Sequence, residues 1–294
     1  MSAVTSRYER PRDDVETGAI PRLQRGNGAA EVTFARRDGA SVLGRLYQRT
    51  PCRVLFPEPE PGDLPIATLL TTSGGLTGGD RIRLAIGVEA GAGAVVTTAA
   101  AEKVYRSLGG EVAVNVNLEI GAGGWLEWLP QETILFDGAR LVRRIDATLA
   151  IGARLLAAET LVFGRAAHGE RFERGLLHEA WRVRVGDRLR WADALCLHEN
   201  IADALDAPVG FGGARALATA LFVAPDAGTY LPLAREFAEA SAARASATVV
   251  NGVLLARFLA ERAEVVRAAV GRYLAAFRHA AAGLPAVLPR LWST

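Results

Sequence analysis

An internal repeat constrains the fold of this 294-residue chain more than any other feature of its sequence. In three segments an alternating apolar strand ends at a glycine turn and another strand follows; the glycines are Gly91, Gly121 and Gly152, 30 and 31 residues apart. A weaker copy follows 34 residues later, at Gly186. Such regular spacing is typical of stacked layers that each add a strand-turn-strand unit, whereas unrelated hairpins are the simpler alternative. The regularity favours stacked layers.

The regions around the repeat differ from it in composition. Residues 1–28 are polar and are predicted to be a flexible lead-in, and residues 29–294 are predicted to form a single domain. Its β body covers about 30–225 and its helical C-terminal part about 230–282. The predicted fold class is therefore mainly β, with a layered, β-solenoid-like or sandwich body and a helical C-terminal region.

Two local patterns support these boundaries. Residues 232–243 and 253–282 carry apolar side chains at three- and four-residue spacing, which predicts helices. Residues 51–65 contain repeated prolines and are predicted to be a loop, because proline is excluded from helix interiors and central strands.

Composition narrows the function classes. The formal net charge of +2 gives no reason to expect nucleic-acid binding, and no apolar stretch is long enough for a membrane span. The N-terminal residues lack the apolar segment of a secretory signal. Cys52 and Cys196 could form a disulfide, but nothing else in the sequence suggests an oxidising compartment. We therefore expect a cytoplasmic protein.

The glycine-rich segment at residues 71–80 superficially resembles a phosphate-binding loop. A P-loop needs a lysine and a following helix, but here Gly79 is followed by Asp80 and then by an alternating strand. An aspartate at this position would repel phosphate. The segment predicts a structured turn into a strand and argues against nucleotide binding.

No catalytic or permanent metal site is evident from motifs. The histidines are not spaced three or four residues apart, so they cannot form a helical metal pair; they are His168, His178, His198 and His279. Ser73 lies in no nucleophile-elbow motif. These residues therefore give little support to hydrolase chemistry.

Several acidic residues lie in apolar surroundings, where an unpaired carboxylate is costly. They are Glu127, Glu132, Asp137, Glu159 and Asp193. Two interpretations remain open. They form salt bridges with the abundant arginines, or they provide a polar route or weak cation site through the β body.

Motifs in five regions resemble, in the same order, those of the urease accessory proteins called UreD (UreH in some bacteria). They cover roughly residues 30 to 205 and are residues 72–80, 101–107, 128–139, 163–170 and 181–193. The resemblance implies a layered β body with two helices and a non-catalytic maturation factor. It also implies binding to UreF, which recruits the GTPase UreG, and delivery of nickel to apo-urease.

The same resemblance implies that nickel, a transient cargo and no permanent cofactor, passes through an internal tunnel. Carboxylate oxygens would hold nickel weakly enough to release it. We expect this route to be lined or guarded by Asp80, Glu132, Glu159 and Asp193, with Glu127 and Asp137 as weaker candidates. A structural role, with an ion-pair cluster among the charged members, is expected for Gly74, Gly75, Gly78, Gly79, Glu102, Lys103, Tyr105 and Arg106.

A second hypothesis belongs to another class of protein, an orphan β-solenoid enzyme that acts on a polysaccharide. Such an enzyme would have an exposed cleft with paired carboxylates and stacked aromatic rings. Trp125 and Trp128 are compatible with this hypothesis, but they would fit a hydrophobic core equally well.

Overall fold

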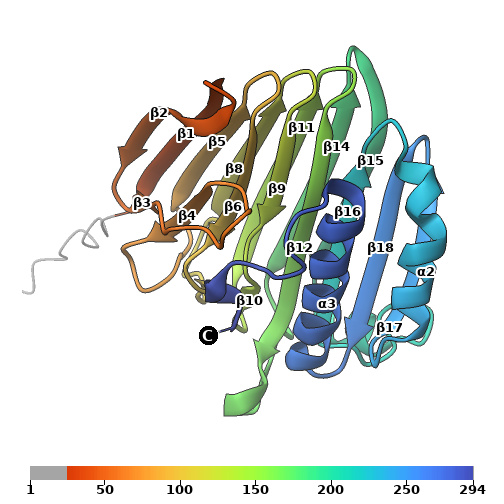
Figure 1. The fold of residues 1–294 in the computed structure, drawn as a ribbon. Helices are drawn as coiled ribbons and strands as arrows, with labels where there is room; N and C mark the ends of the chain where they lie inside the picture. The colour runs from red at the N-terminus through yellow and green to blue at the C-terminus, as the bar shows by residue number, and fades with distance from the viewer. Residues whose placement is uncertain (1–24, 294) are drawn as a thin grey trace, which may run out of the picture.

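Two β-sheets face each other in this protein, and the computed structural model describes residues 25–293 (Figure 1). Sheet A contains, in spatial order, β15 (Arg188–His198), β14 (Leu176–Val185), β11 (Arg140–Leu149), β8 (Val112–Ile120), β5 (Arg81–Val88), β1 (Asn27–Arg37) and β2 (Ala40–Arg49). Sheet B contains β17 (Arg244–Val250), β18 (Val253–Ala260), β16 (Ala216–Val223), β12 (Arg154–Arg165), β9 (Trp125–Leu129), β6 (Gly93–Thr98), β4 (Ile66–Thr71) and β3 (Cys52–Leu55).

The repeat forms stacked layers, as predicted. Each of its three main copies leaves sheet A, turns at a glycine and continues in sheet B, as β5 to β6, β8 to β9 and β11 to β12. Consecutive copies pair in parallel in both sheets. The hairpin alternative is therefore wrong for these copies. It holds for the weaker copy at Gly186, where β14 and β15 pair antiparallel within sheet A.

The layers repeat at a spacing that differs from the sequence alignment. Val88 pairs with Ile120, and Ile120 pairs with Leu149, so the structural repeat is 32 and then 29 residues. The equivalent turn glycines are Gly91, Gly123 and Gly152, with φ of 68°, 66° and 83°. The predicted alignment of Gly121 with the other two is wrong by two residues. A Cβ atom on Gly121 would lie 2.6 Å from the Ala90 backbone nitrogen, so this glycine permits close packing against the preceding layer.

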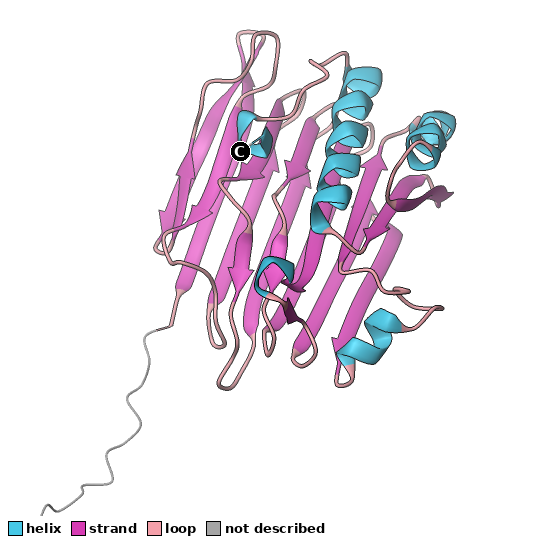
Figure 2. Ribbon diagram, turned by 90° about the horizontal axis from the view of Figure 1, so that it is seen from below, coloured by secondary structure: helices cyan, strands magenta, loops and turns pink. Residues whose placement is uncertain are grey.

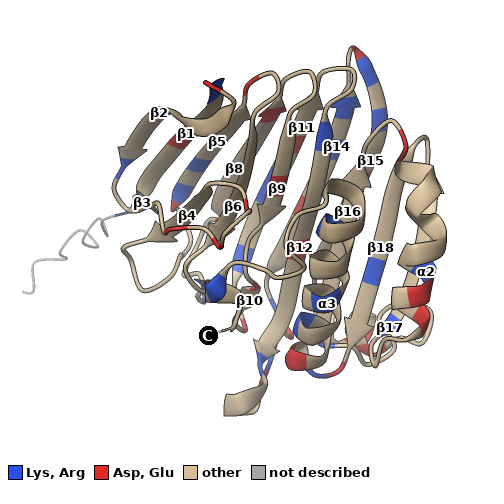
Figure 3. Cartoon of the chain, in the orientation of Figure 1, with Lys and Arg blue, Asp and Glu red and all other residues tan. Residues whose placement is uncertain are grey.

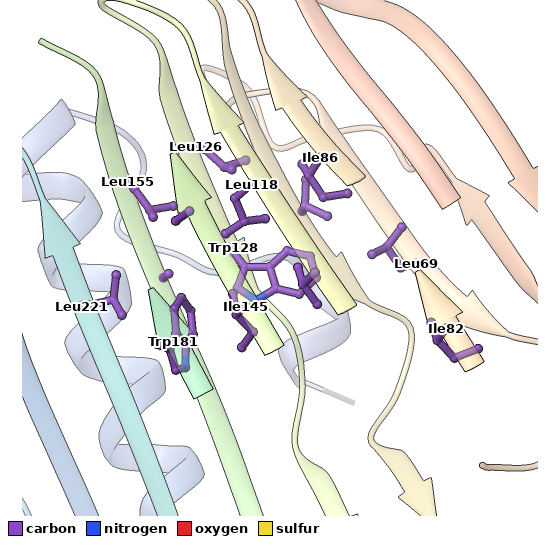
Figure 4. Close-up of a cluster of buried hydrophobic side chains, with 14 of the residues drawn as sticks. Leu69, Ile82, Ile86, Leu118, Leu126, Trp128, Ile145, Leu155, Trp181 and Leu221 are labelled. Atoms are coloured by element: carbon purple, nitrogen blue, oxygen red, sulfur yellow. The ribbon is translucent and has the colours of Figure 1, made fainter. Parts of the chain in front are cut away.

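The main hydrophobic core lies between the sheets, where alternate residues of each strand point inward. Figure 4 shows side chains from sheet A and sheet B meeting there: Ile82, Ile86, Leu118, Ile145 and Trp181 from the first, and Leu69, Leu126, Trp128, Leu155 and Leu221 from the second. Each fully buried side chain of this kind stabilises the fold by about 1.5–3 kcal/mol relative to leaving it exposed.

A second core lies between sheet B and the helices (Figure 1). Helix α3 (Ala263–Ala282) packs on β12, β16 and β18, and α2 (Leu231–Glu239) packs on β17 and β18. The rings of Tyr273 and Phe277 on α3 have centroids 5.1 Å apart. Because this layer covers sheet B, strands such as β9 and β12 are buried on both faces and read as nearly continuous apolar runs.

The C-terminal region differs from the prediction. Residues 253–282 do not form one helical region, because Val253–Ala260 is strand β18 and α3 begins at Ala263. The apolar residues of β18 face two cores, so the strand resembles a helix in its apolar content but pairs with β16 and β17. Strands therefore extend well past residue 225. Helix α2 lies where a helix was predicted at 232–243.

Smaller differences occur near the N-terminus. Strand β1 begins at Asn27, inside the predicted lead-in, and residues 1–24 of that lead-in lie outside the described residues. The predicted loop at 51–65 contains β3, which is the edge strand of sheet B. An edge position is compatible with the flanking prolines, because only one side of the strand needs hydrogen-bond donors.

Short elements connect the layers, and strands dominate the described part of the chain (Figure 2). They are α1 (Ile201–Asp206), η1 (Ala166–His168), η2 (Ala227–Tyr230) and η3 (Arg290–Ser293). The short strands β7 (Glu102–Val104), β10 (Thr133–Leu135) and β13 (Glu170–Arg171) extend sheet B at the side of β12, where β10 and β13 pair with β12 and β7 pairs with β10. Cys52 and Cys196 are both free thiols. Of the helices in residues 25–293, none has the length and apolar character needed to cross a membrane.

Candidate functional site

The glycine-rich turn is a structural joint between distant segments. Asp80 is buried, and its Oδ1 and Oδ2 atoms accept hydrogen bonds from the backbone of Gly26 (2.7 Å) and Thr77 (2.8 Å). Both carboxylate oxygens are therefore used to close the turn and to join the start of β1 to it. Of the four predicted route residues, Asp80 has the clearest structural task.

The two motifs predicted to be structural pack directly on each other. The Leu76 backbone N–H donates to the Lys103 carbonyl at 2.7 Å, and the Tyr105 N–H donates to the Leu76 carbonyl at 2.8 Å. The Tyr105 hydroxyl donates to the Gly74 carbonyl at 2.5 Å. A Cβ atom on Gly75, where φ is 153°, would lie 2.7 Å from the Lys103 carbonyl oxygen. This contact leaves room only for glycine.

The other motif glycines and charges have separate environments. A Cβ atom on Gly78 would lie 2.6 Å from the Gly109 carbonyl oxygen, and Gly79 has a φ of 95°. Within residues 25–293, the expected ion-pair cluster does not form among Glu102, Lys103 and Arg106. Arg106 instead lies 3.9 Å from Asp137, which pairs more closely with Arg174. Glu102 faces the interior.

A cavity of about 400 Å³ lies between the two sheets near this turn. Most of its wall is apolar, with side chains from both sheets such as Leu69 and Leu84. Charged residues interrupt this wall, among them Glu102, Arg143 and Glu159; Arg53 and Lys103 line it as well. The Thr71 hydroxyl donates a hydrogen bond to Glu102 at 3.1 Å.

Arg143 is the centre of a buried ion cluster beside this cavity. It points inward from β11, and its Nε donates to Glu179 on the neighbouring strand β14 at 2.6 Å. Its Nη1 donates to the Thr133 hydroxyl at 2.8 Å and lies 2.9 Å from Oε2 of Glu159, which comes from sheet B. That Oε2 atom accepts no hydrogen bond. Trp128 donates to the other oxygen of Glu159 at 2.8 Å.

A second cavity of about 240 Å³ lies on the other side of this cluster. Glu179 lines it, together with Asp193 and Arg257, which form an ion pair. Glu179 also bonds Arg143, which lines the first cavity, so the cluster separates the two cavities. Of the predicted route residues, Glu159 lines the first cavity and Asp193, whose side chain is 35% exposed, lines the second.

Glu132 and Glu127 lie elsewhere, between sheet B and α3. Glu132 accepts hydrogen bonds from Arg267 of α3 at 2.7 Å to both oxygens. Glu127 accepts from Arg278 of α3 at 2.9 Å, and Arg278 also binds Asp63 and the Pro285 and Val287 carbonyls. Figure 3 shows that acidic and basic residues are distributed over both the strands and the helices of the fold. For these two carboxylates, the salt-bridge interpretation is correct.

Burial raises the pKa of three of these carboxyl groups to about 7, from an ordinary value of 4.5. They are Glu102, Glu127 and Glu159. Desolvation is the largest cause for each; the Thr71 hydrogen bond opposes it most at Glu102, and the charge of a neighbouring arginine opposes it most at Glu127 and Glu159. A carboxyl with such a pKa is about half protonated near neutral pH.

We expect Glu102→Gln to make the protein less sensitive to alkaline pH. Glu102 keeps its proton in the folded state up to about pH 7 but loses it near pH 4.5 when unfolded, so its contribution to stability falls as pH rises through this window. Glutamine does not titrate. The variant should match the wild type at pH 5 and be more stable by about 1–2 kcal/mol at pH 8, with allowance for its partial exposure.

Urea denaturation at the two pH values measures this difference. Glu111→Gln, at an exposed glutamate, is the matched control and should leave the pH dependence unchanged. An equal loss of stability between pH 5 and pH 8 in Glu102→Gln and in the wild type would contradict the prediction.

Sequence reasoning missed Arg143, Glu179, Arg278 and Asp63. A signal for Arg143 was available, because it alternates with Leu141 and Ile145 on β11 and so shares their inward face. The pairing with Glu179 depends on the register of two strands 36 residues apart, which no local pattern supplies. Among residues 25–293 no three His, Cys, Asp or Glu side chains are grouped so that they could hold a metal ion.

The polysaccharide-enzyme hypothesis finds no support in the aromatic residues. Trp125 is 9% exposed and Trp128 is 2% exposed. Both indole nitrogens donate to buried glutamates, Glu127 and Glu159. They are therefore core residues and cannot stack on a bound sugar chain.

Comparison with known proteins gives a consistent result. The family model of the UreD urease accessory protein matches residues 26–293. Urease accessory protein UreD 2 of Methylorubrum populi is 42% identical over 281 residues, which covers 94% of this chain and 93% of that protein. UreD of Magnetococcus marinus is 41% identical over 270 residues (90% and 93%), and UreD of Granulibacter bethesdensis is 44% identical over 239 residues (81% and 99%).

Proposed function

This chain belongs to the UreD family of urease accessory proteins, and on that premise we propose that it delivers nickel to apo-urease together with UreF and the GTPase UreG. The family assignment supports a role in urease maturation. The names of the relatives, accessory proteins without exception among those compared above, fit a protein that assists and does not itself catalyse.

The observation that carries the nickel proposal is a pair of cavities with an ion cluster between them. Glu102 and Glu159 line the first cavity, Arg143 joins Glu159 to Glu179, and Glu179 lines the second cavity with Asp193. Carboxylate oxygens can hold a divalent cation and release it, whereas a histidine and cysteine cage would retain it. Such an arrangement suits nickel as a cargo that passes through the protein.

The remaining parts of the proposal follow from this role. Nickel is cargo and not a resident cofactor, and GTP hydrolysis belongs to UreG, since the glycine-rich turn of this chain is a structural joint. UreF, UreG and apo-urease are the proposed partners, in the cytoplasm. Asp193 and Glu159 are the proposed route residues that line these cavities, whereas Glu132 is held by α3 and Asp80 by the turn.

The test is the nickel content of urease produced with Glu159→Gln. Glutamine keeps an acceptor for Trp128 but removes the charge that faces the cavity. We expect the nickel content of co-expressed urease, measured by mass spectrometry of the purified enzyme, to fall at least fivefold.

Glu127→Gln is the matched control. Its carboxyl is equally buried and has a similarly raised pKa, but it lies against α3, outside both cavities. It should leave nickel content within a factor of two of wild type, provided that the partners still co-purify. Full nickel loading with Glu159→Gln in intact complexes would overturn the proposed route.

A further inference from the structure

The ion cluster between the two cavities contains more carboxyl groups than cationic groups. Arg143 faces Glu159 from sheet B and Glu179 from the neighbouring strand, and Glu102 lies within the same electrostatic neighbourhood. One guanidinium therefore stands among three carboxyl groups. All but Glu102 are almost fully shielded from solvent, so water does little to screen them.

Within the described structure, Arg143 is the only residue that makes polar contacts with both Glu159 and Glu179. Its Nη1 lies 2.9 Å from Glu159, while its Nε donates to Glu179 at 2.6 Å. A guanidinium in this position does what a bound cation would do, since it compensates two buried carboxylates at once. The hold on Glu159 is incomplete, because Oε2 of that residue accepts no hydrogen bond.

The first cavity provides space into which the Arg143 side chain can move. Arg143 itself lines this cavity of about 400 Å³, and Glu102 lines it as well. A rotation of the flexible side chain about its single bonds would carry the guanidinium away from Glu179 and toward Glu102, with a positive charge retained next to a carboxyl group.

We propose that Arg143 is an internal counter-ion gate: it holds the position between Glu159 and Glu179 that a divalent cation takes during transfer from one cavity to the other. This inference rests on the proposed nickel route and assigns its control to one residue. The cation and Arg143 exclude each other from the site, so the path is closed while Arg143 bridges the two carboxylates. Glu159 and Glu179 are the ligands that the cation meets when Arg143 swings aside.

The test is a gain of binding by the purified full-length chain with nickel sulfate. Arg143→Met keeps the length of the side chain but removes its charge, leaving Glu159 and Glu179 without a counter-ion. We expect this variant to bind one nickel ion per chain at least tenfold more tightly than wild type in equilibrium dialysis. Nickel should also raise its melting temperature, because the ion binds the folded state.

Two further variants make the result specific. Adding Glu159→Gln and Glu179→Gln to Arg143→Met should remove the gain. Arg278→Met removes a buried arginine that also pairs with two carboxylates, but outside both cavities, and it should gain no nickel binding.

Arg143→Lys is a second variant that tests the gate if Arg143→Met fails to fold. Lysine retains the positive charge but lacks the planar fork that bridges two carboxylates, so its nickel affinity should lie between those of wild type and Arg143→Met. Unchanged nickel affinity in both variants would overturn the gate. Because no urease is present, that outcome is separate from the nickel-content test of the route itself.

Discussion

Arg278→Met is expected to lower the free energy of unfolding by about 3–5 kcal/mol, the cost typical of removing one partner of a buried ion pair. Arg278 is fully buried on α3 and donates to Asp63 at 2.9 Å and to Glu127 at 2.9 Å. It also donates to the carbonyls of Pro285 and Val287. Methionine removes this donor from two carboxyl groups and two carbonyls, and it leaves the buried carboxyl groups without their positive partner.

Urea denaturation followed by tryptophan fluorescence measures the loss. Arg272→Met on the exposed face of the same helix is the control, and it should change stability by no more than about 0.5 kcal/mol. Combining Arg278→Met with Glu127→Gln should recover part of the loss, because one of the stranded charges is then removed. Equal stability of the Arg278 and Arg272 variants would show that the buried cluster contributes nothing.

Gly75→Ala should destabilise the protein by about 2–4 kcal/mol, the combined cost of overpacking and of an unfavourable backbone angle. The new Cβ atom would lie 2.7 Å from the Lys103 carbonyl oxygen and 2.7 Å from the Tyr105 ring. Strand β7 would have to move, and with it the bond from the Leu76 N–H to Lys103.

The adjacent Gly74→Ala is a close control, since its Cβ atom would meet only the Tyr105 hydroxyl, at 3.6 Å. It should cost less than about 1 kcal/mol. Thermal unfolding of the two variants in parallel tests the contrast. Similar melting temperatures for both would mean that the contact between the two motifs adapts freely.

The layered body could be predicted because its signal is repeated. Glycine is required at the turn of every layer, where φ is positive, and apolar residues alternate on each side of it. The exact spacing could not be predicted, because Gly121 mimics a turn glycine although its role is to let the chain pass close to Ala90. Strand β18 was missed for a similar reason: burial against two layers hides the two-residue period that identifies a strand.

The candidate site was predictable only in part. Glu159 was recognisable as a carboxyl in an apolar run, and it does face a cavity. The same reasoning also selected Asp80 and Glu132, whose partners are a turn backbone and an arginine of α3. The free-energy cost of burying a carboxylate shows that the residue needs a partner, but only the arrangement of strands and helices in the folded chain determines which partner it has. Arg143 and Glu179 come from strands that meet only in the folded sheet.

The parallel stack of strands from β5 to β14 fixes the distance between side chains on neighbouring layers. Neighbouring strands in a sheet lie about 4.7–4.9 Å apart, so inward residues on successive layers are spaced in fixed steps along the stack. Arg143 and Glu179 are one step apart, a distance that a single guanidinium spans. Insertion of a layer of different sequence between β11 and β14 would keep the sheets stacked, yet it would separate this pair by a further step. Such an insertion would leave Glu179 without its arginine while leaving the architecture intact.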